Sequence, residues 1–307
     1  MAVPSSGAIS LAGIRAELAT NTYDDTATTQ SSLLECSNGT VATINTSNEP
    51  GNRPDGDVPH EMSEFYAYDH DLSQFSDNKS FDLDGTNDFL HISSGNFGGS
   101  LETTGSVSMW VKIDSHSFNG VMWQITAEEG TDNQLFVLYH NASQVIRGNV
   151  KLGGTANLVD SATGFENDGN YHHVVMTWNS GTKTSANNVV KLYIDGSLAD
   201  SDAIGNTWND PSEPAQALFG KNVIQNNAFF NGHLNDMAIF SDVLSASEVT
   251  AIYNSGSPKD ESSHSGLLAY YTLEAYTDGD TTVADDSGNS KTLTINNSTN
   301  IDSSDTP

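Results

Sequence analysis

Aspartates at two places in the sequence have the chemistry to hold a metal ion. Asp84 and Asp88 flank a turn near the start of a β-rich region, and a second group lies near its end: Asp278, Asp280, Asp285 and Asp286. Calcium prefers such oxygen ligands. If the first and last strands pair, these carboxylates converge on one Ca²⁺, although none of the loops has EF-hand spacing. The alternative is that they only form turns, where Asp is common.

A second group of side chains has the composition of a sugar site. Trp208, Asn209 and Asp210 follow one another in a long polar loop, and Tyr139 lies near another loop. Sugar binding needs an exposed aromatic ring beside polar side chains. We therefore predict ligand binding at these four residues, while packing in the core is an equal alternative for Trp208.

Sets of residues able to catalyse a reaction are missing from the sequence. His172 and His173 are adjacent in a strand-like segment, so they point to opposite faces and cannot bind one metal together. Neither a Gly-x-Ser-x-Gly turn nor a phosphate-binding loop occurs. Cys36 is the only cysteine, which excludes an intrachain disulfide and fits folding in a reducing compartment.

Short strands between turns dominate from Lys79 onward. Val107, Met109, Val111 and Ile113 alternate with other residues and therefore share one face of a strand. So many short strands are typical of an all-β sandwich or barrel. The predicted strands cover residues 80–83, 89–92, 107–113, 134–139, 145–151, 171–178, 189–194, 217–219, 234–240, 267–273 and 292–295.

A single short helix is predicted among these strands. Ser245 and Glu248 form a capping box, in which each side chain bonds the backbone of the other residue. Val249, Ile252 and Tyr253 then supply an apolar stripe, and Gly256 is the expected end.

Residues 1–72 differ in composition from the rest of the chain. Leu11, Ile14 and Leu18 have helical spacing after Ser10, a suitable N-cap, and a second helix is expected around Met62 and Phe65. A long polar stretch separates the two, so little apolar surface is available for burial. We interpret residues 1–72 as an anchoring or assembly segment and residues 73–307 as the main domain.

The charge of the chain excludes several functions. Forty acidic and 11 basic residues give a net charge of −29, which disfavours nucleic acid and anionic membranes as partners. The sequence also lacks the roughly 20 successive apolar residues of a membrane span. Its first residues do not resemble a signal peptide.

Five motifs occur in a characteristic order: Phe81-Asp82-Leu83-Asp84-Gly85, Ser106-Val107-Ser108-Met109-Trp110-Val111-Lys112, Asn167-Asp168-Gly169-Asn170-Tyr171-His172-His173-Val174, Lys191-Leu192-Tyr193-Ile194-Asp195-Gly196 and Phe230-Asn231-Gly232. Over residues 78–300 this order resembles the laminin-G-like domains of the concanavalin A-like lectin/glucanase superfamily. The resemblance implies a jelly-roll sandwich of two antiparallel sheets that binds or assembles. Glucanases of the superfamily carry Glu-x-Asp-x-x-Glu or Glu-x-Asp-x-Glu, neither of which occurs here.

The N-terminal segment has a resemblance of its own. Pro4-Ser5-Ser6-Gly7-Ala8-Ile9-Ser10-Leu11 and Met62-Ser63-Glu64-Phe65-Tyr66-Ala67-Tyr68-Asp69-His70 are similar to leading segments of tailed-bacteriophage structural proteins. This resemblance implies a tail fibre, spike or capsid decoration protein of the virion, assembled in the host cytoplasm. Other virion proteins, bound through the N-terminal segment, and host-surface glycans are the expected partners, and we expect a homo-oligomer.

Two other functions stay open at this point. A cellular glycan-binding module would carry a secretory signal, which this sequence lacks at its start. A glycoside hydrolase or lyase of the same superfamily would carry the carboxylate motif. A test for secretion would distinguish the first from a non-enzymatic virion protein, and a test for polysaccharide turnover would distinguish the second.

Overall fold

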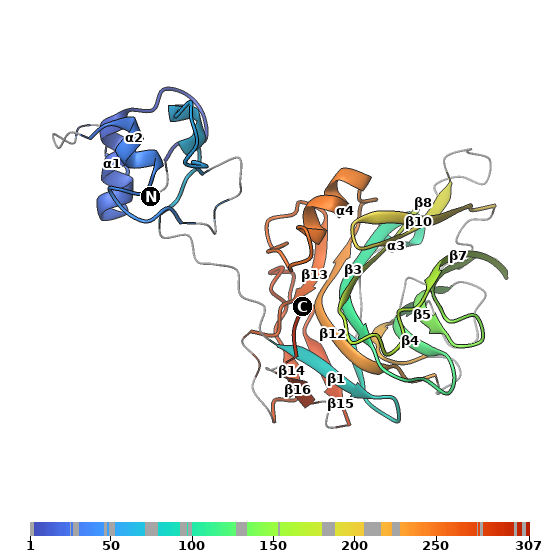
Figure 1. Ribbon diagram of the computed structural model, residues 1–307. Coiled ribbons are helices and arrows are strands. Elements are labelled where there is room, and N and C mark those ends of the chain that lie inside the picture. Colours follow the sequence, from blue (N-terminus) through green and yellow to red (C-terminus); the bar gives the residue numbers. More distant parts are fainter. Residues whose placement is uncertain are drawn as a thin grey trace. The chain divides into compact units, whose positions relative to one another are not determined.

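The chain forms two compact units, Met1–Ser76 and Asp77–Pro307, in the computed structural model shown in Figure 1. The structure describes residues 3–24, 26, 31–45, 48, 53–70, 79–92, 97, 100–126, 134–152, 154–179, 188–205, 216–222, 228–274, 276, 279–297, 300–302 and 305–307.

The first unit has a small apolar core of its own. It contains the helices α1 (Leu11–Thr20) and α2 (Leu33–Ser37) and the 3₁₀ helix η2 (Met62–Phe65). Ser10 caps α1 as predicted, accepting a hydrogen bond from the amide of Gly13. The second predicted helix is only the single 3₁₀ turn of η2, and α2 was not predicted. Buried side chains join these elements: Val3, Ile14, Leu18, Cys36, Phe65 and Tyr68.

The second unit is a sandwich of two antiparallel sheets, as the sequence predicted, and each sheet has eight strands among the described residues. Sheet A contains β1 (Ser80–Asp84), β3 (Thr104–Ile113), β8 (His172–Asn179), β9 (Val189–Ile194), β10 (Ser197–Ala203), β12 (Asn231–Phe240), β13 (Leu267–Tyr271) and β16 (Asn300–Asp302). Sheet B contains β2 (Phe89–Ile92), β4 (Gly120–Thr126), β5 (Gln134–His140), β6 (Val145–Leu152), β7 (Thr155–Thr163), β11 (Gln216–Phe219), β14 (Thr282–Val283) and β15 (Leu293–Asn296).

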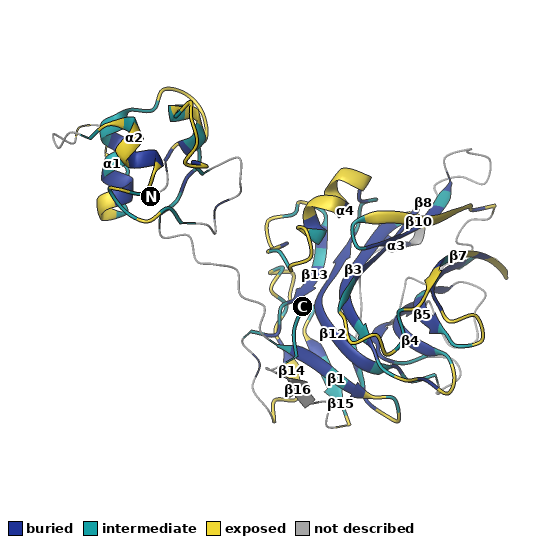
Figure 2. Ribbon diagram, in the orientation of Figure 1, coloured by how far each residue is buried: buried dark blue, intermediate teal, exposed yellow. Residues whose placement is uncertain are grey.

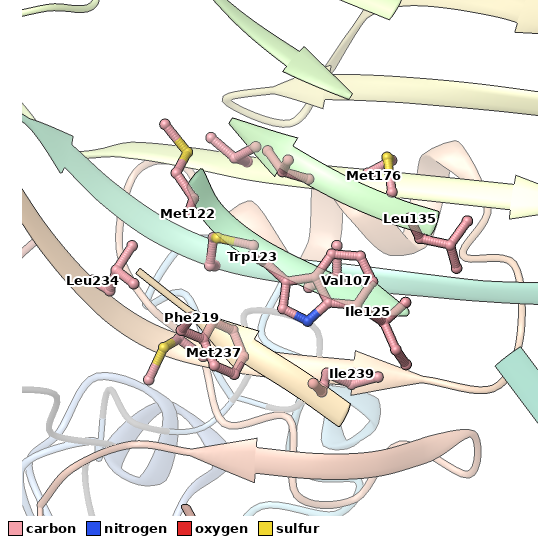
Figure 3. Packing of buried hydrophobic residues seen from close by; sticks show 14 of the residues in the cluster. Val107, Met122, Trp123, Ile125, Leu135, Met176, Phe219, Leu234, Met237 and Ile239 are labelled. Atoms are coloured by element: carbon pink, nitrogen blue, oxygen red, sulfur yellow. The ribbon is translucent and has the colours of Figure 1, made fainter. Parts of the chain in front are cut away.

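Apolar side chains fill the space between the two sheets. The predicted face of β3, with Val107, Met109, Val111 and Ile113, lies in this core. Trp123 of sheet B stacks on Trp178 of sheet A at 5.9 Å between ring centroids. Such a pair contributes about 0.5–1.5 kcal/mol beyond the area that it buries. Figure 3 shows Trp123 surrounded by aliphatic and sulfur-containing side chains from both sheets.

Helix α4 (Ala246–Tyr253) has the capping box that the sequence predicted. It ends at Asn254, whose left-handed backbone forms the C-cap, and not at Gly256. Tyr253 stacks on Trp110 at 5.8 Å. Trp110 is therefore buried, but on the face of sheet A turned away from the core. A four-residue helix, α3 (Ser100–Thr103), precedes β3 and was not predicted.

Exposure follows this arrangement. Figure 2 shows the strands of both sheets largely buried, whereas α4 and β10 are mostly exposed. None of the helices in the described part of the chain is long and apolar enough to cross a membrane.

Candidate functional site

One side of sheet B carries the side chains that best fit a ligand site. Leu90, Ala217 and Val137 point into the core, so their neighbours in sequence point away from it. The strand registers place six such outward-facing residues in one row, one from each of the strands β2, β11, β4, β5, β6 and β7: His91, Leu218, Gln124, Phe136, Asn149 and Leu158. We call this side the outer face of sheet B.

Phe136 lies at the centre of this row and is partly exposed. Its two cross-strand neighbours are amides, Gln124 and Asn149, which are 0% and 6% exposed. Among the described residues, the Oδ1 atom of Asn149 is buried and has no hydrogen-bond partner. A buried acceptor without a partner is costly. A partly exposed aromatic ring suits the apolar face of a sugar.

A rigid ion pair borders Phe136 on β6 and β7. Arg147 donates from Nε and Nη2 to both carboxylate oxygens of Asp160, at 2.6 and 2.7 Å. This side-chain hydrogen bonding raises the pKa of Arg147. The backbone amide of Asp160 donates in turn to Asp200. His140 lies on the same side of β5, and burial lowers its pKa, so it is neutral near pH 7.

The far end of the outer face has a second aromatic group. Lys221 places its Nζ atom 4.2 Å from the ring centroid of Phe89. His91 is hydrogen-bonded to the side chain of Asn296 at 2.9 Å. Burial, and then the charge of Lys221, lower the pKa of His91. The centre of the face and its β2 end thus each combine an aromatic ring with a cation.

Tyr139, a predicted ligand residue, is fully buried and faces the core. Its hydroxyl donates to Glu166 at 2.7 Å, and the other oxygen of Glu166 accepts from the amide of His116 at 2.6 Å. Burial, followed by the Glu166 hydrogen bond, raises the pKa of Tyr139. Tyr139 therefore holds loops together and offers no surface for stacking. The other predicted ligand residues, Trp208, Asn209 and Asp210, lie outside the described residues.

The predicted calcium ligands serve backbone groups instead of meeting one another. Asp84 accepts from the amide of Thr86 at 2.7 Å, and Asp88 accepts from that of Asp84. Asp285 accepts from the amides of Tyr270, Ser287 and Lys291. The first strand, β1, does pair with the last, β16, but the second aspartate group precedes β16 by more than a dozen residues.

Where the chain is described, no three Asp, Glu, His or Cys side chains are grouped as a metal site requires. Asp280 and Asp286 are described, and Asp286 binds the amide and hydroxyl of Thr272. Asp278 lies outside the described residues. The described carboxylates do not fit a calcium site as they stand, so calcium stays a prediction, for which calorimetric titration with calcium chloride is the test.

His172 and His173 point to opposite faces of sheet A, as predicted. His172 lies between Asp195 and Asp168, at 2.8 and 2.9 Å. His173 is buried beside Trp110 and is hydrogen-bonded to Ser108. Burial lowers the pKa of His173 to about 3, which keeps it neutral. Asp195 contacts both residues, but only through the ring of His172 and the backbone amide of His173, which donates to it at 2.9 Å.

A family model for the concanavalin A-like lectin/glucanases superfamily matches residues 84–250, more than half of the chain. The chain therefore belongs to this superfamily. No curated protein sequence matches it.

Solved structures show the same fold at low sequence identity. A Bacteroides ovatus protein assigned to carbohydrate binding is 15% identical, with a TM-score of 0.55. The match covers 76% of this chain and 62% of that one, so this chain spans less than two thirds of its length. A SAP-like pentraxin from Limulus polyphemus (13% identity, TM-score 0.44, 58% and 82% covered) and the Ruminococcus gnavus IT-sialidase CBM40 (16%, 0.42, 54% and 96%) also match.

Proposed function

We propose that this protein is a non-enzymatic glycan-binding module whose ligand lies on the outer face of sheet B. The observation that carries the proposal is Phe136, a partly exposed ring between the amides of Gln124 and Asn149. Stacking on the ring fixes the plane of a sugar, and Asn149, which is 6% exposed, is the neighbouring amide that a hydroxyl can approach. The assignment of the Bacteroides ovatus protein to carbohydrate binding supports this choice.

The acidic residues on the strands of this face are too few for hydrolysis, which favours binding of a glycan without its cleavage. Hydrolysis of a glycosidic bond normally uses two carboxyl groups on either side of it. The strands of sheet B, within their described bounds, contain a single acidic residue, Asp160. Its two oxygens are already held by Arg147. The described strands of this face therefore offer neither a free general acid nor a second carboxylate.

One other group of side chains has the composition of a hydrolase site. Ser80, His233 and Asp305 are linked, with 3.3 Å from Ser80 Oγ to His233 Nδ1 and 3.7 Å from His233 Nε2 to Asp305. Ser80 is fully buried and its hydroxyl donates to the carbonyl of Asp305. A substrate cannot reach it, so we assign the three residues to holding the C-terminal segment.

Glycan-array binding of the wild type and of two variants tests the proposed site. The Phe136→Ala substitution removes the stacking surface and should lower the affinity for the glycan about tenfold or more. Asn149→Ala removes the amide and should weaken binding roughly threefold to tenfold. The control is Leu198→Ala, which truncates a 52% exposed side chain on β10 of the other sheet. Unchanged affinity in both site variants, with thermal unfolding intact, would place the ligand elsewhere.

We further propose that the protein is part of the virion of a tailed phage, as fibre, spike or capsid decoration. The similarity of its N-terminal segment to phage structural proteins supports this role, and that segment forms a compact unit with its own core. Such a unit is suited to holding other virion proteins and further copies of this chain.

Immunogold labelling of purified virions tests the location. Label on the tail would support receptor contact, and uniform label on the capsid would support decoration. Virions without label, together with the protein free in the lysate, would contradict the virion proposal and favour a cellular glycan-binding module.

A further inference from the structure

The side chains that surround Phe136 on the outer face of sheet B are buried in three directions. Across the strands toward β4 and β11, Gln124 and Leu218 are buried. Along β5 itself, the outward positions on either side of Phe136 are Gln134 and Leu138, which are buried as well. A ligand that contacts Phe136 therefore gains little further contact with the described strands in these directions.

The fourth direction, across β6 to β7, is different. Asn149 of β6 is the cross-strand neighbour of Phe136, and Leu158 of β7 is the cross-strand neighbour of Asn149. Val159 points into the core, so Leu158 points outward, and this leucine is 42% exposed. The row from β5 to β7 thus presents two accessible apolar side chains with an amide between them.

We propose that Leu158 is a second contact residue of the glycan site, and that the ligand is an extended, linear chain of at least three sugars that crosses β5, β6 and β7. This inference rests on the proposed glycan-binding function and specifies the shape of its ligand. One sugar ring stacks on Phe136, and another places its apolar face on Leu158. The ring between them lies over Asn149, whose amide its hydroxyls can approach.

The spacing of the strands determines this length. Phe136 and Leu158 lie two strands apart in the order β5-β6-β7, and neighbouring strands are about 4.8 Å apart, so the two side chains are separated by roughly 10 Å. A sugar ring in an extended chain takes up about half of this distance, so the first and third rings of a trisaccharide reach both side chains. Both side chains project from the same face of the sheet, so a chain that coils away from the sheet reaches only one of them.

The experiment measures the affinity of the full-length protein for oligosaccharides of increasing length by isothermal titration calorimetry. The probes are the β-1,4-linked series of glucose, xylose, mannose and N-acetylglucosamine, which are extended, and the α-1,4-linked glucose series, which coils. We expect the affinity for at least one extended series to rise roughly fivefold to tenfold from two rings to three, because the third ring buries Leu158. The coiled series should show no such step.

Variants of Leu158 locate the step. Leu158→Ala should reduce it to about twofold or less and leave the affinity for the disaccharide unchanged, because only the third ring reaches this position. Leu158→Trp offers a larger apolar surface and should enlarge the step. Leu198→Ala is the matched control, because it truncates an exposed leucine on an edge strand of the other sheet, and it should leave every affinity unchanged.

The outcomes separate this inference from the proposed function. Equal affinity for two rings and for longer chains, abolished by Phe136→Ala, would overturn the extended ligand and keep the glycan-binding function. A step that is insensitive to both Leu158 variants would also overturn the inference. Binding on the glycan array without binding of any extended series would have the same meaning. A failure to bind any glycan of the array or of the series would overturn both proposals.

Discussion

His172 is the residue whose protonation is most closely tied to its surroundings. Its two ring nitrogens contact Asp195 on the β9–β10 turn and Asp168 on the segment before β8. Burial alone would lower the pKa of His172, but the hydrogen bonds to Asp195 and Asp168 outweigh burial and raise it. The protonated ring therefore ties two loops to one end of sheet A.

A pH-dependent loss of stability follows from this raised pKa. A histidine whose pKa is higher in the folded state stabilises fully below its unfolded pKa, near 6.5, and this stabilisation is lost as pH rises through the folded value. His172→Gln should therefore reduce the free energy of unfolding by about 1–2 kcal/mol at pH 5.5, and by less at pH 8.5. Urea unfolding of both proteins across this range measures the difference.

His91→Gln provides the contrast. Burial lowers the pKa of His91, so the wild-type residue costs stability as pH falls, and the difference between wild type and variant should change in the opposite direction. If the stability difference between wild type and His172→Gln did not change with pH, or changed in the same direction as for His91→Gln, the protonated ring of His172 would not be stabilised by Asp195 and Asp168.

Phe136 and Tyr139 show why the candidate site was not predicted at the level of residues. They lie on one strand, Gln134–His140, in which apolar residues occupy both faces. Alternation therefore does not say which face is the core. Only the registers with β4 and β6 place Tyr139 inside and Phe136 outside. Composition favoured Tyr139, whose hydroxyl instead binds Glu166.

At the scale of elements, sequence patterns within a few residues predicted the helix that they cap. The capping box of α4 depends on residues three apart, and the structure has it as predicted. Helix α2 has the same box, formed by Ser32 and Glu35, but it lies within a polar stretch that was assigned no structure. That box was the signal by which α2 could have been found.

Strands β4, β7, β10, β14 and β16 were not predicted, and the reasons for β4 and β10 differ. In β4 a register shift between Val121 and Trp123 places both Met122 and Trp123 in the core, which breaks the alternation. In β10 every residue is exposed, so no apolar pattern exists.

Strand β10 forms an edge of sheet A, and its polar sequence has a function there. An edge strand offers unpaired amides to other chains. Asp200 accepts a hydrogen bond from the amide of Ser201, and Asp202 accepts one from that of Ala203. These aspartates occupy amides at the edge and add negative charge, which opposes pairing with a second sheet. The absence of an apolar pattern in β10 thus reflects its position.

At the scale of the whole molecule, the order of the motifs predicted the jelly roll, because each motif marks a strand or a turn of the same architecture. Sequence order does not show which loops meet, so Asp84 and Asp88 were expected to converge with the aspartates at residues 278, 280, 285 and 286. In the structure, Asp84, Asp88, Asp285 and Asp286 bind backbone amides nearby in the chain or on a neighbouring segment.

The two compact units should unfold independently, because each has its own apolar core. Removing residues 1–76 should therefore leave the thermal midpoint of the sandwich within about 3 °C and its glycan affinity unchanged, as differential scanning calorimetry and the array would show. Trp123→Ala in the full chain is the control. It removes a fully buried ring from the sandwich core and should reduce the free energy of unfolding of the sandwich by about 3–5 kcal/mol. The transition of the first unit should not change. A truncated chain that no longer folds would show instead that the first unit is needed to complete the sandwich.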